Sequence, residues 1–256
     1  MLNKQFSYLA GTGRTATHFF SAVLGKHCDR SKVVTFHDGI TDRLKKGNRF
    51  TALQCFTNHA LNLMVKHPHK EHYVECNPAF LEYIALWYGV KQAAFVLPDA
   101  WMAQPARSLL IVRHPFGYVR SLLAKGWGWN WWKLPFADTV YGKHNWQNVN
   151  ALDGLAKAWL VKNQFFYSLA NTENCQLVQY EWLFGDGVSK ADFAKRFRGL
   201  TEFLGLDILI TDNALGDLQR TRFAIKAGPK AHDLTTKQRD IVAAICKPLM
   251  ENLGYE

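Results

Sequence analysis

The chain has 256 residues, of which 48% are hydrophobic, and its 31 Lys and Arg against 21 Asp and Glu give a net charge of +10. This length and apolar fraction suit a single α/β domain over residues 1–256, and no stretch is long enough to span a bilayer. The positive charge favours anionic partners. Nucleic acid is not expected among them, because the basic residues form no dense run and no nucleic-acid-binding motif appears.

The first predicted strand, residues 6–10, leads into Gly11-Thr-Gly-Arg-Thr-Ala-Thr-His18 and then into a predicted helix. Such a loop directs backbone N–H groups, the positive end of a helix dipole and the Arg14 guanidinium at one anion. An ordinary strand-to-helix turn with a Thr N-cap is the alternative reading. The loop is not of the ATPase type, because the Gly-Lys-Ser/Thr of that pattern is replaced by Ala16-Thr17-His18.

A second candidate anion site follows the buried-type strand Ser108-Leu-Leu-Ile-Val112. Pro115 suits the first turn of the next helix. Arg113 then stands at the carboxyl end of the strand, and Ser121 stands about two turns into that helix. A guanidinium and a hydroxyl in this arrangement suit a phosphate, so two such sites indicate a nucleotide with two separated phosphate groups.

Strands and helices are predicted to alternate along the chain, which favours a doubly wound α/β fold: a mostly parallel central sheet with helices on both faces. The strands are expected at 6–10, 32–35, 71–75, 109–112 and 176–180.

Three further helices are predicted from apolar spacing and capping residues. One carries Leu152, Leu155, Trp159, Phe166 and Leu169 on one face; one carries Phe193, Phe197, Leu200 and Leu204 after a Ser189 cap; the last opens with Thr235 and Gln238. Pro248 is expected to kink or shorten the last helix.

These motifs resemble those of the sulfotransferases that use 3′-phosphoadenosine 5′-phosphosulfate, PAPS. Gly13-Arg-Thr-Ala-Thr-His18 is similar to the family's loop Gly/Pro-Lys/Arg-Ser-Gly-Thr-Thr, and Arg113 with Ser121 has the spacing of its second signature. Residues 176–183, 203–206 and 253–255 resemble scaffold segments of the same family. The resemblance implies a P-loop-like fold and transfer of a sulfuryl group from PAPS to a hydroxyl or amine of a small-molecule or glycan acceptor, which can itself be anionic.

The loop departs from the family pattern at two positions. Ala16 replaces the usual glycine, which disfavours a positive φ at that residue, and His18 replaces the second threonine. We interpret this as a variant loop that still binds the donor.

The resemblance assigns roles to the residues that match its motifs. Arg14 is expected to stabilise charge during transfer, while Arg113 and Ser121 are expected to hold the 3′-phosphate. The 5′-phosphosulfate is expected to be held by the loop residues Gly13, Arg14, Thr15, Ala16, Thr17 and His18. No metal is expected.

Two residues are candidates for the general base. Glu75, in Tyr73-Val-Glu-Cys-Asn-Pro78, lies in a segment similar to the Glu-Lys-Thr/Ser-Pro of glycan and bacterial sulfotransferases, although Cys76 replaces the lysine. Capping of a helix near Pro78 or pairing with a lysine are its alternative roles. His37 ends another predicted strand beside Asp38, and its alternative is a solvated loop histidine.

Three other features of the sequence can each be interpreted as functional or as structural. A Trp-rich segment within 125–150 is interpreted as an insertion or lid that contacts the acceptor, with core or partner-binding roles as alternatives. Arg222 and Lys226 are weak candidates for the 3′-phosphate beside a solvated basic loop. The scattered cysteines read as reduced, inert thiols of a cytoplasmic protein without a signal peptide: Cys28, Cys55, Cys76, Cys175 and Cys246.

The sequence therefore predicts a PAPS-dependent sulfotransferase. A small-molecule kinase that uses ATP is one alternative, although the lysine of its loop is missing. A non-catalytic protein that binds nucleotides or polyanions is the other.

Overall fold

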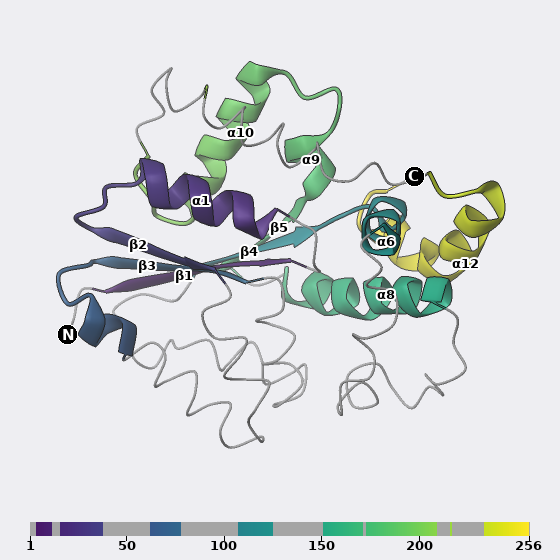
Figure 1. Cartoon of the computed structure of the whole chain (residues 1–256), viewed down its shortest axis with the longest axis horizontal. Helices are drawn as coiled ribbons and strands as arrows, with labels where there is room; N and C mark the ends of the chain where they lie inside the picture. Colours follow the sequence, from purple (N-terminus) through teal and green to yellow (C-terminus); the bar gives the residue numbers. More distant parts are fainter. Residues whose placement is uncertain are drawn as a thin grey trace.

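The structure is a computed structural model that describes residues 4–11, 16–37, 62–77, 107–124, 151–170, 173–208, 216 and 233–255. Within these residues a five-stranded sheet of order β2-β3-β1-β4-β5 forms the centre of the molecule, and every neighbouring pair is parallel (Figure 1). The strands are β1 (Gln5–Gly11), β2 (Val33–His37), β3 (His72–Asn77), β4 (Arg107–Val112) and β5 (Cys175–Gln179). All five predicted strands are confirmed to within two residues.

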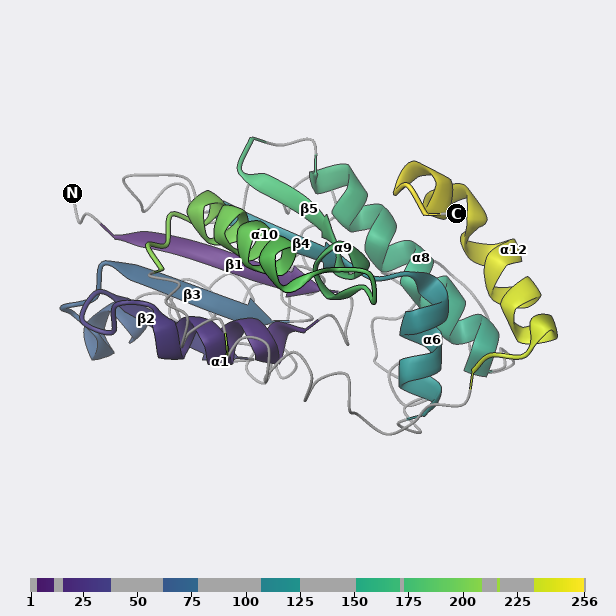
Figure 2. The same cartoon turned by 90° about the horizontal axis from the view of Figure 1, so that it is seen from above.

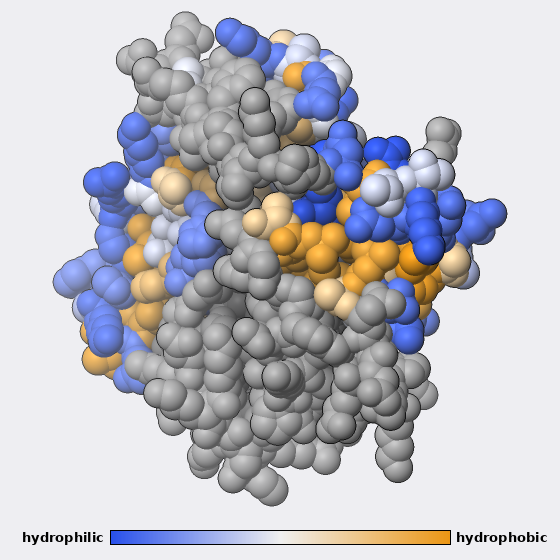
Figure 3. Space-filling view, turned by 45° about the vertical axis from the view of Figure 1, so that its right-hand side comes forward, coloured by the Kyte–Doolittle hydropathy of each residue, from blue (hydrophilic) through white to orange (hydrophobic). Residues whose placement is uncertain are grey.

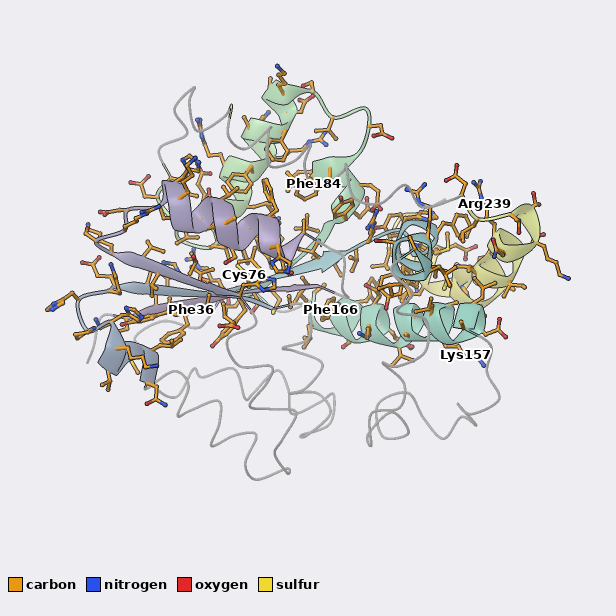
Figure 4. The ribbon with its side chains drawn as sticks, in the orientation of Figure 1. Phe36, Cys76, Lys157, Phe166, Phe184 and Arg239 are labelled. Carbon is orange, nitrogen blue, oxygen red and sulfur yellow. The ribbon has the colours of Figure 1, made fainter. Side chains whose placement is uncertain are left out.

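Helices cover both faces of the sheet, as the doubly wound prediction requires (Figures 1 and 2). On one face lie α1 (Thr17–His27), α9 (Tyr180–Phe184) and α10 (Lys190–Phe203). On the other face α8 (Ala151–Leu169) packs with α6 (Pro115–Leu123) and α12 (Thr236–Asn252). Figure 4 shows Phe184 and Phe166 on opposite sides of the sheet, one in each core.

The central strands are buried on both sides. Along β4, Leu109 and Ile111 belong to the core under α1 and α10, whereas Leu110 and Val112 belong to the core under α8. A strand between two helical layers has no polar face, which explains why the sequence at 108–112 is a continuous apolar run.

Local signals placed most helix ends correctly. Ser189 caps α10 by accepting a hydrogen bond from Asp192 N, and Thr235 with Gln238 forms the capping box of α12. Pro115 occupies the start of α6 after His114, whose ring accepts from Phe116 N at 3.2 Å. Pro248 was expected to kink or shorten the last helix; it does not shorten it, because α12 continues through it to Asn252. Burial of Leu249 and Met250, which follow the proline, stabilises that last turn.

The part of the molecule formed by α6, α8 and α12 shows apolar side chains at its surface between polar ones (Figure 3). Half-buried Phe116, Leu123 and Leu152 pack there against the core below α8. None of the helices within the described ranges is both long and apolar enough to cross a membrane.

A buried polar cluster ties the carboxyl end of α10 to the amino edge of the sheet. Ser7 Oγ donates to the Leu204 carbonyl oxygen at 3.1 Å and lies 2.8 Å from His72 Nε2. Arg107 donates to the Phe203 carbonyl oxygen at 2.8 Å. Burial, reinforced by the positive charge of Arg107 and opposed by a backbone hydrogen bond with Gly205, lowers the pKa of His72 from 6.5 to about 4. The imidazole is therefore neutral in the folded protein at pH 7.

The helix that follows β1 begins with a strained residue. Ala16, the N-cap of α1, has φ 67° and ψ 21°, the left-handed conformation, and makes no side-chain capping bond. It is the one residue other than glycine with a positive φ in the described part of the chain. The expectation that alanine would avoid a positive φ here is wrong, because the packing of α1 against the sheet determines the conformation of its first residue.

We expect Ala16→Gly to stabilise the protein. Glycine adopts the left-handed region without the steric cost of Cβ, so the free energy of unfolding should rise by about 1 kcal/mol and the melting temperature by about 3 °C. Ala22→Gly, at an exposed position inside the same helix, is the matched control and should destabilise by about 1 kcal/mol. Thermal melts followed by circular dichroism measure both, and destabilisation by both changes would contradict the strained conformation of Ala16.

Stability should fall between pH 7 and pH 4.5 through His72. A lowered pKa means that folding favours the neutral form of His72. The stabilisation that His72 contributes to the folded state is therefore fully present above pH 6.5 and is lost as the pH falls towards 4. The loss at pH 4.5 should be about 2 kcal/mol, measured by urea unfolding. His72→Gln should remove most of this dependence, whereas the change His69→Gln at an exposed position should leave it intact. An unchanged pH dependence in His72→Gln would refute the assignment.

Candidate functional site

The carboxyl ends of β1 and β4 meet at one edge of the sheet. Gly11 at the end of β1 is in register with Ile111, one residue before the end of β4. From β1 the chain leads to α1 on one face, and from β4 it leads to α6, which packs with α8 on the other (Figure 1). Neighbouring parallel strands whose helices leave to opposite faces open a crevice at their carboxyl ends, where α/β proteins bind ligands.

The start of α1 forms one side of this edge. The first helical hydrogen bond runs from Phe20 N to the Ala16 carbonyl oxygen at 3.1 Å, and Thr17 is 5% exposed. Backbone N–H groups in the first turn of a helix have no partner within the helix and favour an anion. Of the predicted loop residues, Gly13, Arg14 and Thr15 lie outside the described residues.

The structure brings His37 to the start of α1. His37 is the last residue of β2, and its Nε2 lies 3.3 Å from Thr17 Oγ1. Its ring stacks on that of His18, with centroids 3.5 Å apart and planes inclined by 16°. The candidate base His37 and the predicted donor-binding residues Thr17 and His18 therefore form one cluster at the start of α1.

Arg113 follows β4 directly, as predicted, and its side chain lies along α6. A Cβ at Gly117 would come within 3.1 Å of Arg113 Nε, so the guanidinium passes directly over this glycine. Ser121 is one turn further along α6 than Gly117, and residues four apart share a helix face. The predicted pair of Arg113 and Ser121 thus belongs to one side of one helix.

Two partners of Arg113 were not identified from the sequence. Gly117 provides the space against α6, and Tyr180 places its ring 4.5 Å from Arg113 Cζ in a cation–π contact. Gly117 could have been noticed in the sequence, because a glycine in the first turns of a predicted helix is less favourable there than alanine. No local signal pointed to the second, because Tyr180 is the first residue of α9, 67 residues further along the chain than Arg113.

The peptide group that follows Arg113 is held on both sides. Trp159 Nε1 donates to the Arg113 carbonyl oxygen at 2.6 Å. Glu181 Oε1 accepts from His114 N at 3.0 Å. The carbonyl oxygen and this N–H belong to the same planar peptide unit, so both hydrogen bonds fix its orientation.

Glu75 stands apart from this cluster. It lies two residues before the end of β3, is 4% exposed and is in register with Tyr8 and Phe36. Alternation along β3 places Glu75 on the face of Tyr73, which belongs to the core under α8, whereas Cys76 faces α1. His37 is in register with Cys76, so the two candidate bases occupy opposite faces of the sheet.

Several predicted features cannot be placed. The Trp-rich segment within 125–150, Arg222, Lys226 and Cys55 lie outside the described residues. The four other cysteines are buried free thiols, and burial raises the pKa of Cys28 and Cys246 to about 12. The described parts of the chain contain no group of three or more His, Cys, Asp or Glu residues arranged to hold a metal ion.

No protein-family model matches the sequence, and no curated protein matches it. Solved structures do match. A mouse sulfotransferase, SULT7A1, complexed with PAP is 14% identical at a TM-score of 0.53, covering 97% of this chain and 85% of the other.

Two other sulfotransferases are similar over almost the whole chain. One is the sulfotransferase domain from the curacin biosynthetic pathway, with 12% identity, a TM-score of 0.52 and coverage of 99% of this chain and 98% of the other. The other, from Alicyclobacillus acidocaldarius, has 12% identity, a TM-score of 0.56 and coverage of 99% and 96%. The chain therefore has the fold of these sulfotransferases.

Proposed function

We propose that this protein is a sulfotransferase that takes the sulfuryl group from PAPS and transfers it to a hydroxyl or amine of an acceptor. The observation that carries the proposal is the pairing of two anion-binding elements on adjacent strands: the start of α1 after β1, and Arg113 along α6 after β4. PAPS has a 5′-phosphosulfate and a separate 3′-phosphate, which match two such elements. One neighbour of the same fold is complexed with PAP.

The residues present fit this nucleotide. Because glycine at 117 leaves room for the Arg113 guanidinium against α6, and Ser121 follows one turn later, a phosphate at that end of the helix would meet a forked donor and a hydroxyl. Tyr180 holds the guanidinium from the other side. We assign the 3′-phosphate to Arg113 and Ser121.

The loop after β1 is assigned to the 5′-phosphosulfate. The backbone N–H groups of Thr15 to His18 and the hydroxyls of Thr15 and Thr17 would hold it, with Arg14 as the stabiliser of developing charge. The left-handed Ala16 supports this role, because it supplies the conformation for which the resembling loops use glycine. No metal takes part in this proposal.

During transfer the bond between the sulfuryl sulfur and the bridging phosphate oxygen breaks, and a bond from sulfur to the acceptor oxygen or nitrogen forms. The acceptor proton passes to a general base, and PAP leaves with the phosphate charge held by the loop. The protein contributes positioning, charge stabilisation and this base, as in phosphoryl transfer.

We propose His37 as the base in preference to Glu75. His37 lies at the carboxyl edge and contacts Thr17 and His18, which belong to the donor loop and its helix. Glu75 is buried two residues inside β3 on the opposite face. A base must reach the acceptor beside the donor loop, so the contacts of His37 favour it.

The acceptor is a small molecule or a glycan in this proposal, and the Trp-rich segment within 125–150 would contact it.

The buried free thiols Cys28, Cys76, Cys175 and Cys246 support a reducing, cytoplasmic environment.

Nucleotide binding tests the donor assignment. We expect 3′,5′-adenosine bisphosphate, PAP, at a hundredfold excess over its Kd to stabilise the protein by about 2.7 kcal/mol in thermal-shift assays, with no effect of ATP and Mg²⁺. Arg113→Ala should weaken PAP about 30-fold and 5′-AMP less than about threefold, because hydrogen bonds to charged groups contribute about 1.5–3 kcal/mol.

Arg120→Ala is the matched control for this test. Arg120 lies on α6, seven residues after Arg113, and pairs with Asp233 at 2.6 Å with its side chain 42% exposed, so its replacement removes the same charge and leaves Arg113 in place. It should change PAP affinity less than about threefold. Stabilisation by ATP with Mg²⁺ alone would support a kinase instead, and stabilisation by heparin alone would support a polyanion-binding protein.

Turnover distinguishes the two candidate bases. His37→Gln should lower kcat at least about 100-fold, while PAP affinity measured by calorimetry stays within about threefold. Glu75→Gln should lower kcat less than about tenfold. Acceptors are screened with labelled PAPS and read by mass. The opposite ranking of the two variants would transfer the role to Glu75.

A further inference from the structure

We propose that Tyr255, which follows α12, is a positioning residue for Arg113: through Glu181, its hydroxyl fixes the turn between β4 and α6 that presents the guanidinium to a phosphate. The inference rests on the proposed function, because it concerns recognition of the 3′-phosphate.

Glu181 connects Tyr255 to the turn. Its Oε2 accepts the Tyr255 hydroxyl at 2.9 Å, and its Oε1 accepts from His114 N at 3.0 Å. The Tyr255 hydroxyl also lies 3.4 Å from the Val112 carbonyl oxygen. These contacts reach both peptide groups that flank Arg113, one on each side.

The opposite side of the turn is closed by Trp159, which is fully buried and donates to the Arg113 carbonyl oxygen. The peptide between Arg113 and His114 is held by hydrogen bonds at both its oxygen and its nitrogen. The backbone conformation at Arg113 is therefore fixed in the absence of ligand. The guanidinium is then confined between Gly117 and Tyr180. Pre-organisation of this kind reduces the ordering cost of binding.

The fold places Tyr255 for this contact. Tyr255 N donates to the Met250 carbonyl oxygen at 2.9 Å, and Gly254, with φ 72°, turns the chain at the end of α12. Gln179 at the end of β5 donates to the Leu253 carbonyl oxygen at 2.6 Å, which attaches this turn to the sheet. The ring of Tyr255 meets that of His114 edge to face, with centroids 5.1 Å apart.

The Tyr255 hydroxyl is protonated at neutral pH and can therefore donate a hydrogen bond. Burial raises its pKa far above the ordinary value, and the charge of Glu181 and the hydrogen bond to it act in the same direction. Loss of the hydroxyl would leave one oxygen of the half-buried Glu181 carboxylate without its hydrogen-bond donor. Glu181 would then shift, and the N–H of His114 would lose a fixed acceptor.

The experiment compares PAP with 5′-AMP, which differ in the 3′-phosphate, by calorimetry. Tyr255→Phe should weaken PAP about tenfold while AMP changes less than about twofold. Glu181→Gln should act in the same direction, because the two donors approach different carboxylate oxygens and the amide nitrogen that replaces one of them accepts no hydrogen bond. In an Arg113→Ala background, Tyr255→Phe should alter PAP affinity less than about twofold, because its effect passes through Arg113.

Tyr73→Phe is the matched control. It removes a buried tyrosine hydroxyl that donates to the His67 carbonyl oxygen at 2.8 Å, near the opposite edge of the sheet. The ratio of PAP to AMP affinity should not change. Circular dichroism melts verify that each variant is folded, and Glu181→Gln tests the same link if Tyr255→Phe does not fold.

The outcomes separate the two proposals. A wild-type protein that binds PAP no better than AMP would overturn the proposed function and this inference with it. A wild-type preference for PAP that persists unchanged in Tyr255→Phe and Glu181→Gln would overturn the inference alone. An effect of Tyr255→Phe that remains full size without the Arg113 side chain would also overturn it, since the tyrosine would then act by another route.

Discussion

The reversal of winding direction between β1 and β4 is the constraint on which the candidate site depends. From β1 the chain crosses to β2 and returns to β3 beside β1, whereas β4 adds on the other side. The helices after β1 and β4 therefore leave to opposite faces and cannot close over the strand ends. This arrangement alone brings the start of α1 and Arg113, about a hundred residues apart in sequence, to one edge of the sheet.

Local chemistry explains which parts of the fold were predictable. The apolar run 109–112 predicted a strand buried on both faces, and Ser189 and Thr235 mark helix starts through hydrogen bonds within a few residues. The order of the strands has no such signal, because β3 pairs with both β1 and β2 through contacts remote in sequence. The helix continues past Pro248 for the same reason: tertiary burial of the residues that follow it offsets the local cost of a proline in α12.

In the candidate site, too, the sequence predicted what local spacing determines and missed the contacts between separate elements. The spacing of Arg113 and Ser121 is set by one strand end and one helix, so the sequence predicted their placement. The stacking of His37 on His18 and the approach of Tyr180 to Arg113 join separate elements, and no spacing in the sequence encodes them. Glu75 was selected as a strand-end residue, but the strand extends two residues beyond it, since strand boundaries depend on pairing with neighbours.

The two proposed anion-binding elements are held by different physical means. After β4, Trp159 donates a hydrogen bond to the Arg113 carbonyl oxygen, and the His114 N–H donates one to Glu181. Both backbone groups of the turn therefore have a hydrogen-bond partner, which holds the turn in place. At β1, the loop ends in a residue whose conformation costs about 1 kcal/mol. Burial of Phe19, Phe20, Val23 and Leu24 in α1 offsets this cost, since each such side chain contributes about 2 kcal/mol. Helix packing can therefore hold Ala16 in a conformation that usually needs glycine, which is how this position can depart from the resembling pattern.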